Sequence, residues 1–303
     1  MKRRKRRSRL PLFVGLVLVT FLVGFLYVWA DASQKDDAKS SNTELFASFT
    51  GMSDAVEDAT NPPELTVLAH VTRIADTRYL ELVNRDNATG NEPDDKLIVS
   101  AWPAVPVRVT SIMLHETTVE AVGELFAAAR EDQVGTFFVS SGYRTYAEQK
   151  QIYDDMSDRS YAQPPGHSEH ETGLAADILA MDVLQSEMDA SREGQWLAAN
   201  AWKYGLLLRY PQGKQDVTGI AYEPWHFRYV GQPHAWYCEQ NDMCLEEYIQ
   251  FLKDTGGYNT VHDGKAYTIL YQTPQNGMLY VPEKLDYTIS GDNTGGYIVT
   301  AWE

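Results

Sequence analysis

Apolar side chains recur at helical spacing between residues 117 and 131, where they return to one face every three or four positions. This spacing predicts an amphipathic helix over 117–131. The residues of its apolar face are Val119, Val122, Leu125, Phe126 and Ala129. Directly afterwards, Gly135 precedes the run Thr-Phe-Phe-Val, which predicts a buried strand at 136–140. The pattern therefore favours a fold that mixes helices with strands.

A second helix is predicted to begin near Tyr146. Thr145 and Glu148 have the spacing of a capping box, in which each side chain bonds the other residue's backbone N–H. This start would place Arg144 at a junction between strand and helix and Gln149 in the first helical turn. Both side chains would then lie where a ligand can approach.

Further along the chain, two more helices are predicted, at about 192–203 and 244–254. Gly205 and the pair Gly256-Gly257 follow them as C-terminal stops. From Lys265 onward, short alternating segments are separated by Gly, Asn and Asp, which predicts a small β extension. We place it at residues 259–303.

The N-terminal part has a different character. Residues 1–9 hold seven Lys or Arg and no acid, and residues 10–30 contain no charged residue. A helix of this length would span about 30 Å, the thickness of a bilayer core, and the basic flank predicts that residues 1–9 stay cytoplasmic. We therefore expect a transmembrane anchor at 10–30. Cleavage at Ala30-Asp31-Ala32 is the alternative, and residues 31–61 have the composition of a flexible stalk.

The charge distribution argues against binding to nucleic acid. The formal net charge is −16, and the chain beyond residue 9 carries 19 basic against 42 acidic residues. A nucleic-acid-binding protein needs its positive charge on a folded face. The chain contains two cysteines, Cys238 and Cys244. An exported protein can join such a pair in a disulfide, while two separate buried thiols remain the alternative.

Two short segments concentrate residues that can bind metal or move protons. The first, PPGHSEHETGLAAD, ends at Asp177 and includes His170; the second, YEPWH, contains Glu223 and His226. Because Glu223 precedes a proline, it is expected in extended backbone, which excludes the helical H-E-x-x-H zinc arrangement. Each residue alone has an ordinary structural explanation, and only their combination is specific.

That combination resembles the zinc D-alanyl-D-alanine carboxypeptidases of the VanY type, a family shared with D-Ala-D-Ala dipeptidases and LD-carboxypeptidases. The similarity runs from about ELVNRDN (81–87) to CLEEYIQFL (244–252) and includes SGYR, SEHETGLAAD and EPWH. The resemblance implies that His170, Asp177 and His226 bind Zn²⁺ and that Glu223 is the catalytic base. It further implies a substrate site lined by Arg144, Gln149, Ser168, Tyr210 and Trp225.

The residue types suit this chemistry. Two neutral imidazoles and one carboxylate leave Zn²⁺ a positive charge and an open position, where the pKa of water falls to about 7. Arg144 is the cation in these motifs that can take a catalytic part, by holding either the substrate carboxylate or the developing oxyanion. Small residues at Gly173 and Ala175-Ala176 suit a turn and a packed strand that return Asp177 to His170. We expect His167, Glu169 and Glu171 to lie on the loop surface.

The fold class we predict is α+β, with helices packed around a small, mostly antiparallel sheet that carries the zinc site. The transmembrane helix precedes this zinc carboxypeptidase domain, assigned to residues 62–258, and the β extension follows it. A protein held outside a cell by its N-terminal helix meets peptidoglycan stem peptides that end in D-Ala-D-Ala. The predicted activity is removal of the terminal D-Ala, which would weaken glycopeptide binding to the cell wall and so favour resistance.

Other functions remain open at this point. The same fold could serve an LD-carboxypeptidase, a dipeptidase or a peptidoglycan endopeptidase, although a membrane segment counts against action on a free cytosolic dipeptide. A wall-binding module with a structural zinc would need no base, so Glu223 counts against it. Finally, the β extension could be the main element that binds a partner.

Overall fold

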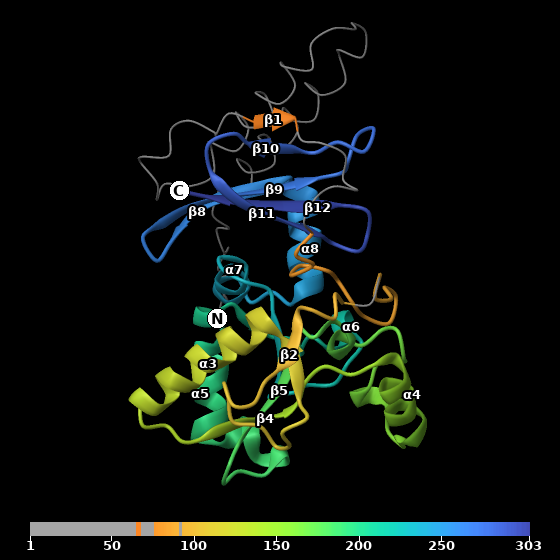
Figure 1. Cartoon of the computed structure of the whole chain (residues 1–303), viewed down its shortest axis with the longest axis vertical. Helices are drawn as coiled ribbons and strands as arrows, with labels where there is room; N and C mark the ends of the chain where they lie inside the picture. The colour runs from red at the N-terminus through yellow and green to blue at the C-terminus, as the bar shows by residue number, and fades with distance from the viewer. Residues whose placement is uncertain (1–64, 68–75, 91–92) are drawn as a thin grey trace, which may run out of the picture. The chain divides into compact units, whose positions relative to one another are not determined.

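The computed structural model describes residues 65–67, 76–90 and 93–303, all within the compact unit formed by residues 56–303 (Figure 1). The predicted basic tip (1–9), transmembrane anchor (10–30) and stalk (31–61) lie outside the described residues. Within the described ranges, no helix is long and apolar enough to cross a membrane. The fold is a mixture of helices and antiparallel sheets, which confirms the predicted class.

Two of the three predicted metal ligands, Asp177 and His226, lie on a four-stranded antiparallel sheet with the order β4-β5-β7-β6. Its strands are β4 (Phe137–Ser141), β5 (Ala175–Ala180), β7 (His226–Tyr229) and β6 (Leu206–Leu208). In the register of this sheet, Asp177 on β5 lies opposite both Ser141 on β4 and His226 on β7. Residues 49 positions apart in the sequence therefore meet across two neighbouring strands.

Helices flank this sheet, and their starts follow the sequence signals. Helix α3 (Glu116–Glu131) has the predicted apolar face buried, and α4 (Tyr146–Asp155) begins with the predicted capping box of Thr145 and Glu148. Gly205 ends its segment in the left-handed conformation, as expected. The remaining helical segments are η2 (Arg159–Tyr161), η3 (Glu169–Thr172), η4 (Gln185–Ala190), α5 (Arg192–Asn200), η5 (Ala201–Tyr204), α6 (Gln215–Thr218), α7 (His234–Gln240) and α8 (Leu245–Thr255).

One hydrophobic core joins α3 to the site-bearing sheet. Leu125 and Phe126 of α3 pack with Phe137 of β4 and Ile178 of β5, and all four are almost completely buried. A short hairpin of β2 (Ile98–Ser100) and β3 (Met113–His115) leads into α3. The buried faces of α3, β4 and β5 therefore hold in place the sheet that carries Asp177 and His226.

The C-terminal segments form a second four-stranded antiparallel sheet with the order β11-β12-β9-β8, drawn in blue in Figure 1. Its strands are β8 (Gly257–His262), β9 (Lys265–Gln272), β11 (Asp286–Gly291) and β12 (Tyr297–Trp302). Strand β10 (Tyr280–Pro282) pairs instead with β1 (Leu65–Val67). The predicted β character of this region is confirmed, whereas the domain boundary at residue 259 stays a prediction.

A second hydrophobic core connects this sheet to the preceding helices. Ile269 of β9 and Ile298 of β12 pack with Tyr248 and Leu252 of α8 in one buried cluster. Both cysteines are buried beside this region and are free, with no disulfide between them. The structure thus favours the alternative of two separate thiols.

Candidate metal centre and substrate cavity

A tight turn brings the first two predicted metal ligands together. His170 lies in η3, and the chain reverses at Gly173, whose φ of +74° is a conformation that favours glycine. A Cβ at Gly173 would lie 2.4 Å from the Cδ1 of Ile98, so the turn also has no room for a side chain. Strand β5 then carries Asp177 back towards His170, as the small residues of this segment predict.

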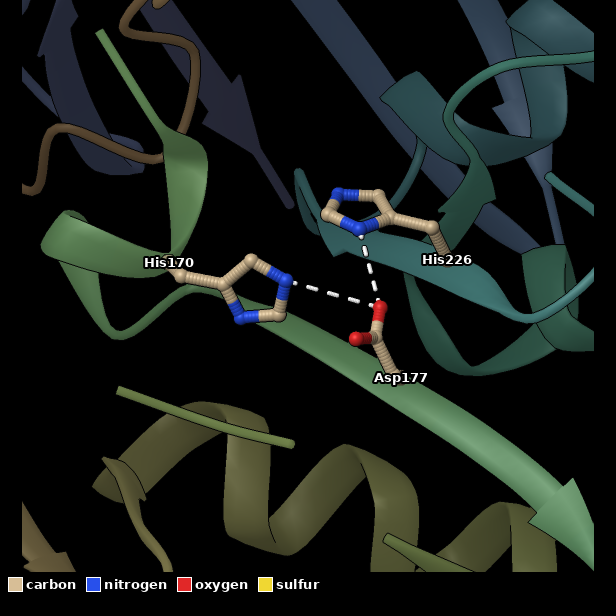
Figure 2. Close-up of side chains that lie close together, drawn as sticks. All are labelled: His170, Asp177 and His226. Carbon is tan, nitrogen blue, oxygen red and sulfur yellow. Dashed lines mark hydrogen bonds and ion pairs between the residues drawn. The ribbon is translucent and has the colours of Figure 1, made fainter. Parts of the chain in front are cut away.

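His170, Asp177 and His226 converge on one point (Figure 2). The Asp177 Oδ1 atom lies 3.4 Å from His170 Nε2 and 3.0 Å from His226 Nδ1. One ligand atom from each residue falls within 4.8 Å of the others. The structure therefore assembles the three residues that the sequence motifs predict as ligands.

The hydrogen bonds around the two histidines fix which nitrogens face the centre. His170 Nδ1 lies 2.7 Å from the carbonyl oxygen of Gly142, which can only accept, so Nδ1 carries the hydrogen and Nε2 is left for a metal. His226 Nε2 lies 3.3 Å from a carboxylate oxygen of Glu169, which leaves Nδ1 facing Asp177. Partners of this kind orient the histidine ligands in metal sites.

The electrostatics of the centre also suit a cation. Burial and the charge of Arg144 lower the pKa of His170 to about 4, so its Nε2 lone pair is free at neutral pH. Although burial lowers the pKa of His226, hydrogen bonds to Asp177 and Glu169 raise it to about 9, so this position favours positive charge. Two nitrogen donors and one carboxylate fit Zn²⁺, and His170, Asp177 and His226 would hold it.

Glu169 has a structural position that the sequence interpretation missed. Its side chain is fully buried and accepts hydrogen bonds from Arg209 Nε at 2.7 Å and Arg228 Nη1 at 2.9 Å. Arg209 also forms a two-pronged ion pair with Glu246 at 2.6 and 2.8 Å. We call Glu169, Arg209, Arg228 and Glu246 the charged network. Because Glu169 also contacts Nε2 of His226, the network holds the imidazole ring of a predicted metal ligand in place.

The expectation of a solvated loop is therefore wrong for both glutamates. Glu169 is 1% exposed and Glu171 is 7% exposed, and Glu171 accepts hydrogen bonds from the backbone N–H of Gly166 at 2.9 Å. The partly buried His167 makes a hydrogen bond with the carbonyl oxygen of Asn84 at 2.8 Å. The hydrogen bonds of these side chains hold the loop in place. A buried charged group requires a partner, and a single sequence motif does not show where that partner lies.

Glu223 lies beside the centre without joining the ligand set. Its Oε2 is 3.8 Å from His226 Nδ1, and the residue is 6% exposed. Its backbone N–H donates to the carbonyl of Tyr210, which anchors the segment before Pro224, and Glu223 lies outside any helix, as predicted. Burial raises the pKa of Glu223 to about 8, so this carboxyl group can both accept and release a proton near neutral pH.

A cavity of about 450 Å³ opens from the metal centre, and all five predicted substrate-binding residues line it. They are Arg144, Gln149, Ser168, Tyr210 and Trp225. The Tyr210 ring lies 4.9 Å from the His226 ring, and Trp225 stacks on Tyr161 at 6.5 Å. The cavity therefore joins the metal centre to an aromatic surface and to α4. The catalytic and binding roles of these residues stay predictions.

Arg144 enters the cavity from the junction before α4, as its place in the sequence predicts. Burial lowers the pKa of its guanidinium, although Asp177 and Glu223 favour the charged form. Its Nε is buried and has no hydrogen-bond partner among the described residues. An unpaired cationic donor in a cavity is a position for an anionic ligand.

Comparison with known proteins agrees with these motifs. Residues 111–232 match the family model described as VanY, D-alanyl-D-alanine carboxypeptidase. A D-alanyl-D-alanine carboxypeptidase of Enterococcus faecalis is 32% identical over 225 residues, which cover 68% of this chain and 78% of that protein. The chain belongs to the VanY D-alanyl-D-alanine carboxypeptidase family. The resemblance inferred from the sequence is confirmed.

Other VanY-related proteins match different shares of the chain. A D-alanyl-D-alanine carboxypeptidase of Enterococcus faecium is 39% identical over 194 residues, covering 64% of this chain and 63% of that relative, so less than two thirds of its length is matched. The crystal structure of the vancomycin resistance D,D-dipeptidase VanXYg, bound to a D-Ala-D-Ala phosphinate analogue, is 29% identical with a TM-score of 0.68. That match covers 80% of this chain and all of the other.

The structure adds residues that motif reading did not single out. The two arginines of the charged network lie in the apolar segments LLLRY and HFRYV, and a charge inside a buried strand is a signal that a partner must exist. Gln163 also lines the cavity, just before the segment PPGHSEH. Nothing in the local sequence distinguishes it from a surface glutamine.

Proposed function

We propose that this protein is a zinc-dependent D-alanyl-D-alanine carboxypeptidase that removes the C-terminal D-Ala from peptidoglycan stem peptides. The observation that carries the proposal is the convergence of His170, Asp177 and His226 in a cavity that also holds Glu223 and Arg144. Membership of the VanY family supports the same activity and substrate class.

The residues around the centre have complementary tasks in this reaction. When bound, Zn²⁺ supplies a Lewis acid that lowers the pKa of water and polarises a carbonyl group. Glu223 accepts the proton of the attacking water and then donates it to the nitrogen of the departing D-Ala. The raised pKa of Glu223 suits a group that must perform both transfers. Arg144 stabilises negative charge, either on the terminal carboxylate or on the oxyanion.

Specificity in this scheme follows from the cavity walls. Tyr210 and Trp225 provide an apolar surface beside the methyl group of the terminal D-Ala, while Ser168 and Arg144 provide polar contacts. A methyl group in an apolar pocket contributes only about 1–3 kcal/mol to discrimination, whereas an unpaired buried polar group is penalised more heavily. The terminal carboxylate should therefore matter more than side-chain size.

The deciding experiment incubates the protein and Zn²⁺ with a pentapeptide stem ending in D-Ala-D-Ala, and identifies products by mass. We expect release of one D-Ala, little hydrolysis of free D-Ala-D-Ala and near loss of cleavage when the terminal carboxylate is amidated. Equal cleavage of the amidated peptide would indicate an endopeptidase. Preference for a tetrapeptide stem would indicate an LD-carboxypeptidase, and bound zinc without any product would indicate a wall-binding module.

The metal assignment has its own test, independent of substrate. Metal analysis should find one zinc per wild-type chain and a large loss of zinc in His226→Ala, because one of three protein ligands is removed. His262→Ala serves as the control that should keep its zinc, because this partly buried histidine on β8 lies outside the predicted ligand set. Full zinc occupancy in both His170→Ala and His226→Ala would contradict the ligand assignment.

We further propose that the protein is anchored in the cell membrane by residues 10–30, with the catalytic domain on the cell-wall side. The support is in the sequence, where an uncharged 21-residue run follows seven basic residues. Removal of D-Ala at that location would contribute to glycopeptide resistance. Cell fractionation tests the anchor: mature protein that begins at Asp31 or Ser33 and is free in the medium would show cleavage instead.

A further inference from the structure

Two glutamine side chains in the cavity wall have polar atoms without partners. Gln149 is 1% exposed and Gln163 is 4% exposed, so neither amide is solvated to any extent. Among the described residues, Gln149 Oε1 and both Oε1 and Nε2 of Gln163 are buried without a hydrogen bond. Burial of unpaired amide groups is unfavourable, and most buried polar groups in folded proteins are paired. These atoms therefore point to a ligand.

The orientation of the Gln149 amide follows from its neighbour. Its Nε2 donates to the backbone carbonyl of Gln163 at 2.7 Å, and a carbonyl oxygen can only accept a hydrogen bond. The nitrogen of Gln149 must therefore face Gln163, which leaves Oε1 as a free acceptor. The same bond holds α4 to the segment after η2, so the two amides occupy one wall. We call Gln149 and Gln163 the amide wall.

The composition of the amide wall selects the kind of group that can bind there. Gln163 presents a donor and an acceptor on one planar amide, and Gln149 adds a second acceptor. A carboxylate would find two oxygens that cannot donate to it. A neutral group that both donates and accepts, such as a peptide bond, matches the set.

Within the proposed carboxypeptidase reaction, the position of that peptide bond is restricted. Downstream of the scissile bond the substrate has a single residue that ends in a carboxylate, so any further peptide group lies upstream. We propose that the amide wall pairs with a backbone peptide group of the stem peptide upstream of the scissile bond. Gln163 exchanges two hydrogen bonds with that group, and Gln149 accepts another from the same strand of substrate. This inference rests on the proposed function.

The amide wall would then make the enzyme respond to the length of the peptide. A stem peptide offers upstream peptide groups, whereas free D-Ala-D-Ala has only the bond to be cleaved. Selectivity for stem peptides would come in part from polar atoms that are left unpaired when a short ligand binds. Gln149 was expected in the substrate site from the sequence; Gln163 and the kind of group it recognises are assigned from the structure.

The test replaces Gln163 by methionine, which preserves the length of the side chain and removes both polar atoms. Binding is measured by calorimetry in a Glu223→Ala background, so that the pentapeptide stays intact. We expect Gln163→Met to weaken binding about 10- to 100-fold, the effect of losing two buried hydrogen bonds. Gln250→Leu, an exposed glutamine on α8, is the control and should bind as the parent does.

Peptides in which one upstream N–H is replaced by an ester oxygen identify the partner group. At one position the ester should weaken binding to the parent protein, and this penalty should disappear in Gln163→Met, because the two changes remove the same hydrogen bond. Thermal unfolding should show no loss of stability in Gln163→Met, since an unpaired buried amide is replaced by an apolar group.

Three results would overturn the inference: unchanged binding in Gln163→Met, ester penalties that persist at every upstream position in that variant, or binding lost together with stability. The first two would show that Gln163 does not touch the peptide, and the third that it serves the fold. Because binding is measured without turnover, these outcomes are separate from a failure of the proposed reaction. A chain that binds stem peptides through Gln163 but never cleaves them would refute the reaction alone.

Discussion

On one side of the metal centre, Glu169 is buried with the guanidinium groups of Arg209 and Arg228 within 2.9 Å of its carboxylate. In the cavity, the amide wall is buried and Arg144 is partly buried, and both keep buried polar atoms without partners in the described part of the chain. The carboxylate of Glu169 in the charged network has its hydrogen-bond partners without a ligand, whereas the amide wall and Arg144 keep polar atoms that lack partners. The difference separates groups that position the metal centre from groups that can contact a substrate.

The largest effect we expect is on turnover, from a substitution of Glu223, which belongs to neither the charged network nor the amide wall. Glu223→Ala should lower kcat by about 10⁴-fold, the upper end of the usual range of about 10²–10⁴ for acid–base groups, because one group serves both proton transfers. Zinc content and thermal stability should stay close to wild type, since Glu223 is not a ligand. The exposed Glu239→Ala is the matched control. A Glu223→Ala rate above about a tenth of wild type would contradict the proposed role.

The next effect is on stability and tests the charged network. Glu169→Leu leaves Arg209 and Arg228 buried without their shared carboxylate, so we expect the free energy of unfolding to fall by about 3–5 kcal/mol. Urea unfolding measures the change. Asp154→Ala, which breaks the exposed pair with Lys150, should cost about 0–1 kcal/mol. Equal effects of the two substitutions would mean that burial does not distinguish these ion pairs.

The same network gives a pH dependence with a definite sign. Burial alone would raise the pKa of Glu169, but Arg209 and Arg228 outweigh it and hold the pKa well below that of a free glutamate. A carboxyl group with a lowered folded-state pKa stabilises the fold above its unfolded pKa and loses that contribution as the pH falls through the folded value. The difference in the free energy of unfolding between wild type and Glu169→Leu should stay constant around neutral pH and shrink only in strong acid.

A smaller effect, on kcat/KM, is expected from Arg144, whose buried Nε has no partner among the described residues. Arg144→Lys keeps the positive charge but removes the buried Nε and the planar fork, so kcat/KM for the stem peptide should fall about 10- to 100-fold. Steady-state kinetics with free and amidated peptides measure it. If Arg144 holds the terminal carboxylate, the variant should lose most of its preference for the free acid. Unchanged preference with a lower kcat would place Arg144 at the oxyanion.

The smallest effect concerns the two cysteines, which belong to neither the charged network nor the amide wall. Because Cys238 and Cys244 are buried and free, a reductant should leave the melting temperature unchanged. Thiol labelling should modify neither residue in the folded protein and both after denaturation. A clear drop in melting temperature on reduction would instead reveal a disulfide.

Much of the fold and of the metal centre was accessible from the sequence, because local patterns carry the information. The capping box before α4, the glycine stops and the alternating C-terminal segments all depend on neighbouring residues. The resemblance supplied His170, Asp177 and His226, which the structure brings together. In contrast, Glu169 was misplaced on the surface because its partners, Arg209 and Arg228, are 40 and 59 residues away.

Gln163 illustrates the limit in another way. Its proposed role depends on the absence of hydrogen-bond partners for its amide in the described part of the chain, and sequence spacing does not reveal such an absence. Local propensity and motifs therefore predict which elements form and which chemistry they carry. The pairing of buried polar groups between distant segments has to be seen in the folded chain.

The turn at Gly173 limits which amino acids can replace glycine at this position. Gly173 and Gly213 both have positive φ, of +74° and +85°, but a Cβ at Gly213 would meet nothing within 4 Å. In a library covering every codon at both positions, Asn and Asp should survive selection at 213, because they tolerate this backbone conformation. At 173 the contact with Ile98 excludes them as well, so only clones that retain glycine should persist.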